Sequence, residues 1–342
     1  MNALLDLSLI GGPFLSALYT LAGLAVAGLL LRRQAVRNTF RTVAIAVAGS
    51  LVGWVVVWLV SDVWDIFGVS MSTTTRLWTG GAFGAVALAV ANLIGTRSRR
   101  RVLAIIAIPL CVFAAAAGIN AEFGQFTTVR AALGIPLYGA LQDALSSPAS
   151  SVDDTRGVVG TVRIPPTVSG FPARDAMVYL PAAARAAAPP ELPVIEMLSG
   201  QPGSPADMFT AGRLAAILDD FAATHHGLAP IVVVPDQLGA PGKNPMCVDS
   251  KLGNSASYLT VDVPAWIHAH YRVAAAPDGW AIAGFSQGGT CSIQLGAEHP
   301  DLFGTILDIS GELVPKSGST AQTIQAGFAG SAAAYAAAAP SA

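Results

Sequence analysis

The sequence has few charged residues, few cysteines and few histidines for its length. Only 12% of its 342 residues are charged, whereas soluble domains carry about 25%, so part of the chain is expected to lie in a membrane. The formal net charge of −2 gives no indication of a nucleic-acid partner. The 3 cysteines and 5 histidines form no cluster with metal-ligand spacing, so neither a metal nor another cofactor is expected.

Charge is absent altogether from four long apolar stretches within residues 1–121. A helix needs roughly 20 apolar residues to cross the hydrocarbon core of a bilayer. We therefore predict an all-α bundle of four membrane helices, over residues 9–31, 42–60, 77–96 and 102–121. Transporters and channels usually place ionisable groups inside the membrane. A membrane anchor is therefore favoured over a transporter-like protein with an accessory domain.

The short connections between these stretches indicate how the helices are oriented. Arginines gather between the first two stretches and between the last two, and positive loops of this kind face the cytoplasm. They are Arg32, Arg33, Arg37, Arg41, Arg97, Arg99, Arg100 and Arg101. The N-terminus and everything after residue 121 are then extracytoplasmic. We expect a multi-pass protein of the cell membrane whose partner is the lipid bilayer.

Two pairs of glycines in the apolar stretches have a spacing that suits helix packing. Gly49 and Gly53 stand four residues apart in the second stretch, and Gly80 and Gly84 do so in the third. Small residues at this spacing let two membrane helices approach closely. They predict a tight contact between these helices rather than a function of their own.

The rest of the chain has the pattern of a separate domain. Residues 122–155 are the predicted linker, which ends in a run of serine, proline and alanine. Over residues 156–342, strand-like apolar runs alternate with helix-like segments, which is typical of a mostly parallel sheet with helices on both faces. Residues 157–164 and 175–180 should pair as a hairpin, and a long loop over 235–257 should border the substrate pocket.

One turn of this domain has the spacing of a nucleophile elbow. Gly284-Phe285-Ser286-Gln287-Gly288 follows an apolar strand-like run and precedes a helix-forming segment. In such an elbow the serine lies on a strained strand-to-helix turn, and the flanking glycines leave room for a close approach of the backbone. The alternative is a glycine-rich turn with an incidental serine. We interpret Ser286 as a nucleophile.

Other motifs accompany the elbow. They are Leu198-Ser199-Gly200-Gln201, Val234-Pro235-Asp236, Glu298-His299-Pro300-Asp301-Leu302-Phe303 and Ile309-Ser310-Gly311. With the elbow, they resemble the putative-esterase family of α/β-hydrolases, which includes esterase D, enterochelin esterases and secreted mycolyltransferases. The resemblance implies an α/β-hydrolase fold and an ester or acyl-lipid substrate that reacts through an acyl-Ser286 intermediate. It also implies an oxyanion hole made by the backbone N–H groups of Gln287 and Gln201, although Gln201 could be an ordinary turn residue.

The two cysteines of this domain are expected to form a disulfide. Cys247 lies in the long loop and Cys291 lies five residues after Ser286, in a compartment that permits disulfides. The bond would hold the loop beside the nucleophile, and two unpaired buried thiols are the alternative. Cys111 lies in an apolar stretch and is expected to be a buried thiol.

The other members of a catalytic triad have no clear counterpart. In α/β-hydrolases the acid and the histidine follow the nucleophile along the chain. The last histidine of the sequence, His299, would lie at the far end of the helix that Ser286 begins, about 20 Å away. We expect it to cap that helix, and no catalytic histidine is assigned. Asp308 is a candidate acid, with a structural role favoured.

The hydrolase domain is therefore expected to lack its last strands, as a fragment, a frameshifted product or a degenerate paralogue. Loss of the general base of a triad lowers kcat by about 10⁶ in a serine protease, so we expect little or no esterase activity. The favoured interpretation is a membrane-anchored extracytoplasmic serine esterase or acyltransferase that the missing histidine cripples. The alternative is a non-catalytic membrane protein that uses the hydrolase scaffold for binding.

Overall fold

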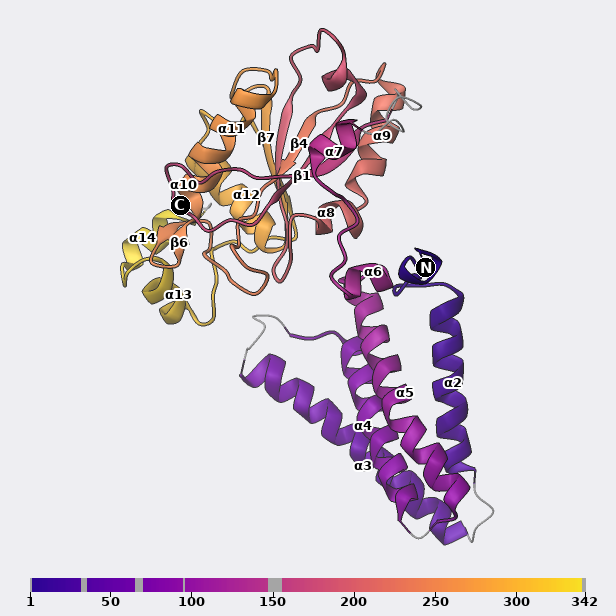
Figure 1. The fold of residues 1–342 in the computed structure, drawn as a ribbon. Helices are drawn as coiled ribbons and strands as arrows, with labels where there is room; N and C mark the ends of the chain where they lie inside the picture. The colour runs from indigo at the N-terminus through magenta and orange to yellow at the C-terminus, as the bar shows by residue number, and fades with distance from the viewer. Residues whose placement is uncertain (1, 32–35, 65–69, 95, 147–155, 340–342) are drawn as a thin grey trace. The chain divides into compact units, whose positions relative to one another are not determined.

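The chain forms two compact units, Met1–Pro136 and Leu137–Ala342, which are drawn in Figure 1. The residues that a computed structural model of the protein describes are 2–31, 36–64, 70–94, 96–146 and 156–339. Of the arginines that indicate the orientation, Arg32 and Arg33 lie outside these ranges. The second unit begins inside the predicted linker, because the short helix α7 (Leu141–Ser146) packs against the first strand of the sheet.

The described residues of the first unit form four long helices that overlap the predicted apolar stretches, and two short helices outside those stretches. The long helices are α2 (Pro13–Leu30), α3 (Val36–Trp58), which continues as a π-helical turn η1 (Leu59–Val63), α4 (Thr73–Leu93) and α5 (Ser98–Phe123). The short helices are α1 (Asn2–Leu5) and α6 (Val129–Ala132). By length and composition, three helical segments could cross a membrane: Pro13–Leu30, Thr39–Val63 and Ser98–Phe123. The predicted third span falls on α4, which is not among them. Threonines and glycines, together with Arg76 and Asn92, dilute its apolar residues.

Helices α3 and α4 pack closely at the paired glycines, as predicted. A Cβ atom added at Gly84 would overlap the hydroxyl of Ser50 and lie 2.8 Å from the carbonyl oxygen of Ala46. One added at Gly53 would lie 3.0 Å from the Cα atom of Gly80. The two backbones therefore approach so closely that a side chain at these positions has no room.

We predict that Gly84→Leu destabilises the helical unit by about 1–3 kcal/mol, because the added side chain must push α3 away from α4. The matched control is Gly81→Leu on the same helix, since a Cβ atom at Gly81 meets nothing within 4 Å. Thermal unfolding of the detergent-solubilised chain should show a lower midpoint for Gly84→Leu alone. Equal midpoints for the two variants would contradict the packing.

The second unit contains a six-stranded sheet. Its strands are β1 (Val158–Val162), β2 (Ala176–Leu180), β3 (Val194–Leu198), β4 (Ile231–Val234), β7 (Trp280–Phe285) and β8 (Thr305–Ile309), and their spatial order is β1-β2-β4-β3-β7-β8. The pairs β1–β2 and β2–β4 are antiparallel, so the predicted hairpin is present. From β4 to β8 all neighbours are parallel. The carboxyl ends of β3, β4, β7 and β8 therefore meet at one edge of the sheet.

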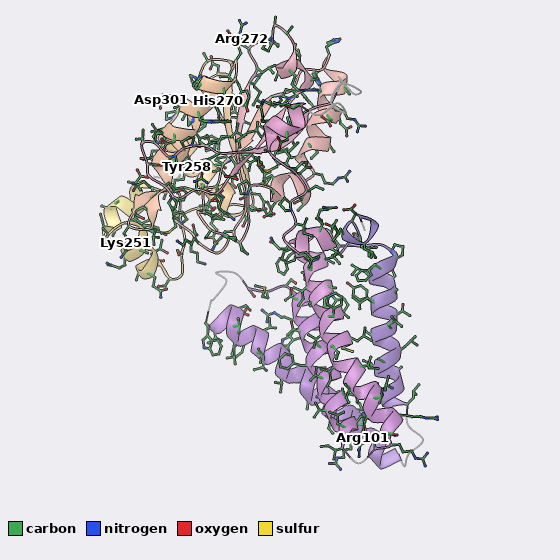
Figure 2. The ribbon with its side chains drawn as sticks, viewed as in Figure 1. Arg101, Lys251, Tyr258, His270, Arg272 and Asp301 are labelled. Carbon is green, nitrogen blue, oxygen red and sulfur yellow. A yellow bond between two sulfur atoms is a disulfide. The ribbon has the colours of Figure 1, made fainter. Side chains whose placement is uncertain are left out.

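Helices cover both faces of this sheet, as the alternating pattern predicts. One apolar cluster contains side chains from α11 (Val263–His270), from the π-helical turn η4 (Tyr258–Asp262) and from α12 (Gln287–Glu298). The other contains side chains from α8 (Asp207–Thr210) and α9 (Leu214–Thr224). Tyr258, which Figure 2 labels, is wholly buried in the first cluster.

Shorter elements complete the second unit. They are η3 (Ala182–Arg185), the two-stranded ribbon β5 (Asp249–Ser250) and β6 (Gly253–Asn254), α10 (Ser255–Ser257), α13 (Thr320–Gly327) and α14 (Ala332–Ala337). Among the described residues, β8 is an end strand of the sheet, and all of its residues are exposed.

A buried carboxyl group interrupts the apolar pattern of β3. Glu196 is 0% exposed, and it pairs in register with Val233 of β4 and Ile282 of β7. Within the described part of the chain, neither of its carboxyl oxygens has a hydrogen-bond partner. Burial raises the pKa of Glu196 well above the usual value for glutamate. Burial in the folded protein therefore favours the neutral form of this side chain.

This burial predicts a loss of stability with rising pH. Above the pKa of glutamate in the unfolded chain, about 4.3, the unfolded state releases a proton that the folded state keeps. The folding free energy then weakens by up to about 1.4 kcal/mol per pH unit, until the raised folded pKa is reached. Glu196→Gln has no proton to release, so its stability should exceed that of the native chain increasingly above about pH 4. Urea unfolding across this pH range measures the difference, and a gap independent of pH would contradict the prediction.

Candidate functional site

Ser286 lies at the turn between strand β7 and helix α12, where it is the N-cap residue of the helix. Its backbone has φ 55° and ψ −118°, a combination that side-chain-bearing residues rarely adopt and that costs about 1–3 kcal/mol. Its N–H donates to the carbonyl oxygen of Ile309 at 2.8 Å, and its own carbonyl accepts the N–H of Thr290 at 3.0 Å. The strand, the turn and the helix are thus arranged as the elbow motif predicts.

The glycines on either side of Ser286 are required by contacts of the backbone. A Cβ atom at Gly284 would overlap the carbonyl oxygen of Gly288. One at Gly288 would overlap the carbonyl oxygens of Leu198 and Ser199, at the end of β3. The spacing of the motif therefore reflects two close backbone contacts. One is between β7 and α12 within the elbow, and the other is between the first turn of α12 and the end of β3.

The loop after β3 runs beside Ser286. A Cβ atom added at Gly200 would lie 3.5 Å from the Cβ atom of Ser286, so the segment leading to Gln201 passes next to it. Gln287 is the first residue of α12, and the first N–H groups of a helix have no partner inside the helix. The segments that carry the two expected oxyanion donors are therefore both next to Ser286. The side chain of Gln201 points to the next loop and donates to the carbonyl of Gly242 at 3.1 Å.

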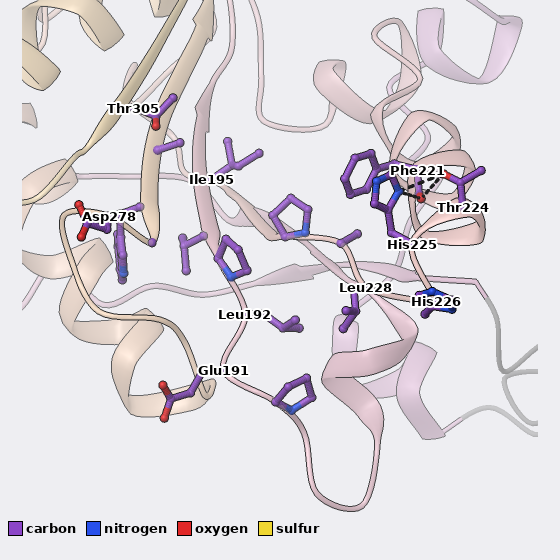
Figure 3. A pocket seen from close by; sticks show the side chains of 18 residues that line it. Glu191, Leu192, Ile195, Phe221, Thr224, His225, His226, Leu228, Asp278 and Thr305 are labelled. Carbon is purple, nitrogen blue, oxygen red and sulfur yellow. Dashed lines mark hydrogen bonds between the residues drawn. The ribbon is translucent and has the colours of Figure 1, made fainter.

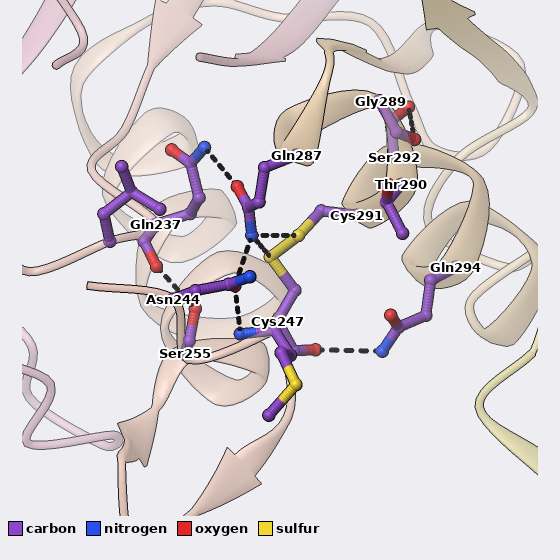
Figure 4. The surroundings of a disulfide bond; sticks show 12 residues. Gln237, Asn244, Cys247, Ser255, Gln287, Gly289, Thr290, Cys291, Ser292 and Gln294 are labelled. Carbon is purple, nitrogen blue, oxygen red and sulfur yellow. Dashed lines mark hydrogen bonds between the residues drawn. A yellow bond between two sulfur atoms is a disulfide. The ribbon is translucent and has the colours of Figure 1, made fainter. Parts of the chain in front are cut away.

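Polar side chains that the sequence analysis did not single out connect these segments, and Figure 4 shows them. Gln237 donates to the carbonyl of Ser199 at 2.5 Å and to Oε1 of Gln287 at 3.0 Å. The amide nitrogen of Gln287 donates in turn to Oδ1 of Asn244 at 3.1 Å. Gln237 directly follows Val234-Pro235-Asp236, so its place at the carboxyl end of a strand was the available signal.

The predicted disulfide is present between Cys247 and Cys291, with 5.7 Å between their Cα atoms. It joins the loop after β4 to α12, and the amide nitrogen of Gln287 lies 3.1 Å from Sγ of Cys291 (Figure 4). On the other side, Gln294 donates to the carbonyl of Cys247 at 3.2 Å. Cys111 is a free, buried thiol, as expected.

Asp308 lies behind the elbow, on the strand next to β7. It pairs in register with Gly284, and one of its carboxylate oxygens accepts the N–H of Gly311 at 2.7 Å. A Cβ atom at Gly289 would overlap that same oxygen. The carboxylate therefore stabilises the turn after β8 and supports the first turn of α12. Within the described part of the chain, no hydrogen bond or ion pair joins this carboxylate to a histidine.

The histidines lie away from the elbow. His299 is the C-cap residue of α12, as predicted, at the end opposite to Ser286. The rings of His225, His268 and His270 stack on Phe221, Trp280 and Trp266, respectively. Trp280 begins β7 and Ser286 follows its end, so the length of that strand, about 20 Å, separates the two places. Among the described residues, no hydrogen bond joins a histidine ring to Ser286.

An apolar pocket of about 730 Å³ lies at the amino ends of the parallel strands, where Figure 3 shows it. Leu192 and Pro193 before β3, Pro230 before β4 and Gly279 before β7 line it, together with His225. Ligands of parallel α/β sheets bind at the carboxyl ends of the strands. This pocket is therefore at the opposite edge of the sheet from Ser286 and is no part of the candidate site.

Comparisons with known proteins agree with the resemblance to putative esterases. A family model described as putative esterase matches residues 173–339. A protein of Corynebacterium glutamicum, described only as uncharacterized, is 30% identical over 341 residues, which cover 96% of this chain and 78% of that protein. The MPT51/MPB51 antigen of Mycobacterium tuberculosis is 38% identical over 72 residues, or 21% of this chain and 23% of the antigen.

Solved structures match about half of the chain. A ferulic acid esterase is 20% identical, with a TM-score of 0.41, and the match covers 51% of this chain and 65% of the esterase. The crystal structure of Mycobacterium tuberculosis MPT51 is 24% identical, with a TM-score of 0.35, and the match covers 51% of this chain and 59% of that one. This chain thus spans less than two thirds of either solved chain.

The close backbone contact between the first turn of α12 and the end of β3 leads to a stability prediction. Gly288→Ala places a methyl group against the carbonyl oxygens of Leu198 and Ser199, and we expect it to destabilise the α/β unit by about 1–3 kcal/mol. Gly242→Ala is the matched control, because a Cβ atom at Gly242 meets nothing within 4 Å. Denaturant unfolding of both variants measures the difference in their free energies of unfolding. A Gly288→Ala variant as stable as the control would contradict the close backbone contact at Gly288.

Proposed function

Because this chain belongs to the putative-esterase family of α/β-hydrolases, we propose that Ser286 is the nucleophile of an acyl-transfer site for carboxylic esters. The observation that carries the proposal is the strained backbone of Ser286 between β7 and α12. Strain of this kind persists where the surrounding structure enforces it, and such residues cluster at functional sites. At this turn the hydroxyl lies at the carboxyl ends of the parallel strands, where α/β sheets bind ligands.

The chemistry follows from this placement. The hydroxyl oxygen of Ser286 attacks the ester carbonyl carbon and gives a tetrahedral intermediate, and its proton passes to solvent water, which later protonates the departing alcohol. The backbone N–H groups of Gln287 and Gln201 are the proposed donors to the oxyanion of that intermediate. Loss of the alcohol leaves an acyl-Ser286 ester, which water or an acceptor alcohol then cleaves. Water as acceptor makes the protein an esterase, and an alcohol makes it an acyltransferase.

The lack of a histidine beside Ser286 to accept its proton limits the proposed rate of ester turnover. Each histidine of the chain is either before β7 or at the far end of α12, and Asp308 is bound within its own turn. Without an imidazole next to the serine, a triad enzyme loses about 10⁶ in kcat. We propose that the polypeptide of 342 residues turns esters over slowly. The positions of the histidines also favour the second candidate, a scaffold that binds without catalysis.

The location proposed for this site is the outer side of the cell membrane. Three apolar helices long enough to span a bilayer precede the α/β unit, and arginines gather in the connections of the helical unit. The disulfide between Cys247 and Cys291 suits an oxidising compartment. These features together support a membrane-anchored, extracytoplasmic site whose substrates are esters or acyl lipids.

A fluorophosphonate probe tests the nucleophile, because it reacts covalently with activated serines. We expect slow labelling of the folded chain, no labelling of Ser286→Ala and unchanged labelling of Ser250→Ala, since Ser250 is a serine of the short ribbon β5. Mass spectrometry of the labelled peptide locates the probe. Labelling that survives in Ser286→Ala would refute the assignment, and a folded chain that never labels would favour the binding scaffold.

A further inference from the structure

The loop after β4 contacts both segments that carry the proposed oxyanion donors, and one side chain in it, Gln237, reaches both of them. We propose that Gln237 is a positioning residue. It fixes the backbone N–H group of Gln201, in the loop after β3, relative to the backbone N–H group of Gln287. The proposal rests on the function proposed for Ser286. It assigns to Gln237 no contact with the substrate.

The hydrogen bonds of the Gln237 carboxamide link the two segments directly. Its nitrogen carries two N–H donors, one to the carbonyl of Ser199 at 2.5 Å and the other to Oε1 of Gln287 at 3.0 Å. The carbonyl of Ser199 can only accept, so the nitrogen of Gln237 must face it. Ser199 stands two residues before Gln201. A shift of either segment would therefore break one of the two bonds.

Burial makes this link a strong one. Both Gln237 and Ser199 are 0% exposed, so water cannot replace the bonds when they break. A buried acceptor left without its donor loses its hydrogen bond with no compensation from water. The energy of the buried amide thus opposes any separation of the loop after β3 from the first turn of α12.

Gln237 is itself held in place. Its main-chain carbonyl oxygen accepts a hydrogen bond from the hydroxyl of Ser255 at 3.1 Å. The preceding residue, Asp236, is 0% exposed and forms an ion pair with Arg174, with 2.7 Å between Nη2 and Oδ1. One oxygen of Asp236 also accepts the N–H of Leu238 at 3.1 Å. The main chain on both sides of Gln237 is therefore fixed, and the side chain can act as a rigid spacer.

The loop after β4 also contacts the later residues of the loop after β3. The N–H of Gly203 donates to the carbonyl of Pro241 at 3.2 Å, and the side chain of Gln201 donates to that of Gly242 at 3.1 Å. Arg174 bridges Asp236 and the carbonyl of Gly203, which it reaches at 3.0 Å. These contacts restrain the loop from the side of β4. Gln237 adds a direct hydrogen-bonded link between the start of the loop after β3 and α12.

The test compares acylation of the full chain by 4-nitrophenyl acetate and by its thionoester, in which sulfur replaces the carbonyl oxygen. Sulfur accepts hydrogen bonds weakly, so a well-placed oxyanion hole favours the oxygen ester. Release of 4-nitrophenolate gives both rates, and Ser286→Ala gives the background. The ratio of the two rates does not depend on the fraction of folded protein, because both rates fall equally with it.

We expect Gln237→Met to lower acylation by the oxygen ester about ten- to a hundredfold, below the 10²–10³ that loss of an oxyanion donor causes. The rate with the thionoester should change little, so the ratio should fall by a similar factor. Gln237→Glu, whose carboxylate cannot donate, should behave alike. The control is Gln294→Met, a buried glutamine of α12 that binds the carbonyl of Cys247 instead and should keep the native ratio.

Each outcome decides one claim. Acylation that depends on Ser286, together with an unchanged ratio in Gln237→Met and Gln237→Glu, would overturn the role of Gln237 and leave the nucleophile in place. A fall in both rates without a change in their ratio would show that Gln237 only stabilises the fold, which also overturns the proposal. Absence of acylation that depends on Ser286 in the native chain would overturn the proposed function itself, and the role of Gln237 with it.

Discussion

The close approach of backbone to backbone at Gly284 and Gly288 is the constraint on which the α/β unit depends. Strand β7 must end, turn and become α12 within three residues, and the first turn of that helix must also fit against the end of β3. The strained serine, the two glycines and the loop beside Gly200 all follow from this geometry. A side chain at either glycine would separate the helix from the sheet, and with it the parts of the site.

Local patterns in the sequence were sufficient to predict the α/β unit. The elbow, the hairpin of β1 and β2, the mostly parallel character of the sheet and the disulfide could be predicted, because each leaves a signal in period, spacing or residue type. The neighbours of β7, which are β3 and β8, could not be read from these signals. Glu196 and the bonds of Gln237 could not. They depend on which side chains from distant segments meet inside the fold, and single glutamate and glutamine residues carry no periodic signal. Such pairings are decided by tertiary packing.

In the helical unit, too, the sequence predicts one feature well and another less well. The glycine pairs of α3 and α4 indicated the tight contact, because a four-residue spacing places them on one face of each helix. The number of spans was less certain from the same residues. The glycines that let α4 pack against α3 also lower its apolar character, and within the described part of the chain α4 is not among the three helical segments that are long and apolar enough to cross a bilayer. Packing between helices and burial in lipid favour different residues, and α4 has those that suit packing.

The bond between Cys247 and Cys291 closes a ring of the main chain that contains β7, the elbow and Ser286. A protease that cuts anywhere between the two cysteines therefore leaves a single covalent molecule, which separates into two pieces only after reduction. The exposed ribbon of β5 and β6 lies inside this ring. A nick there would leave the serine tethered on both sides. The ring thus keeps Ser286 covalently attached to both sides of such a cut, which hydrogen bonds alone could not ensure.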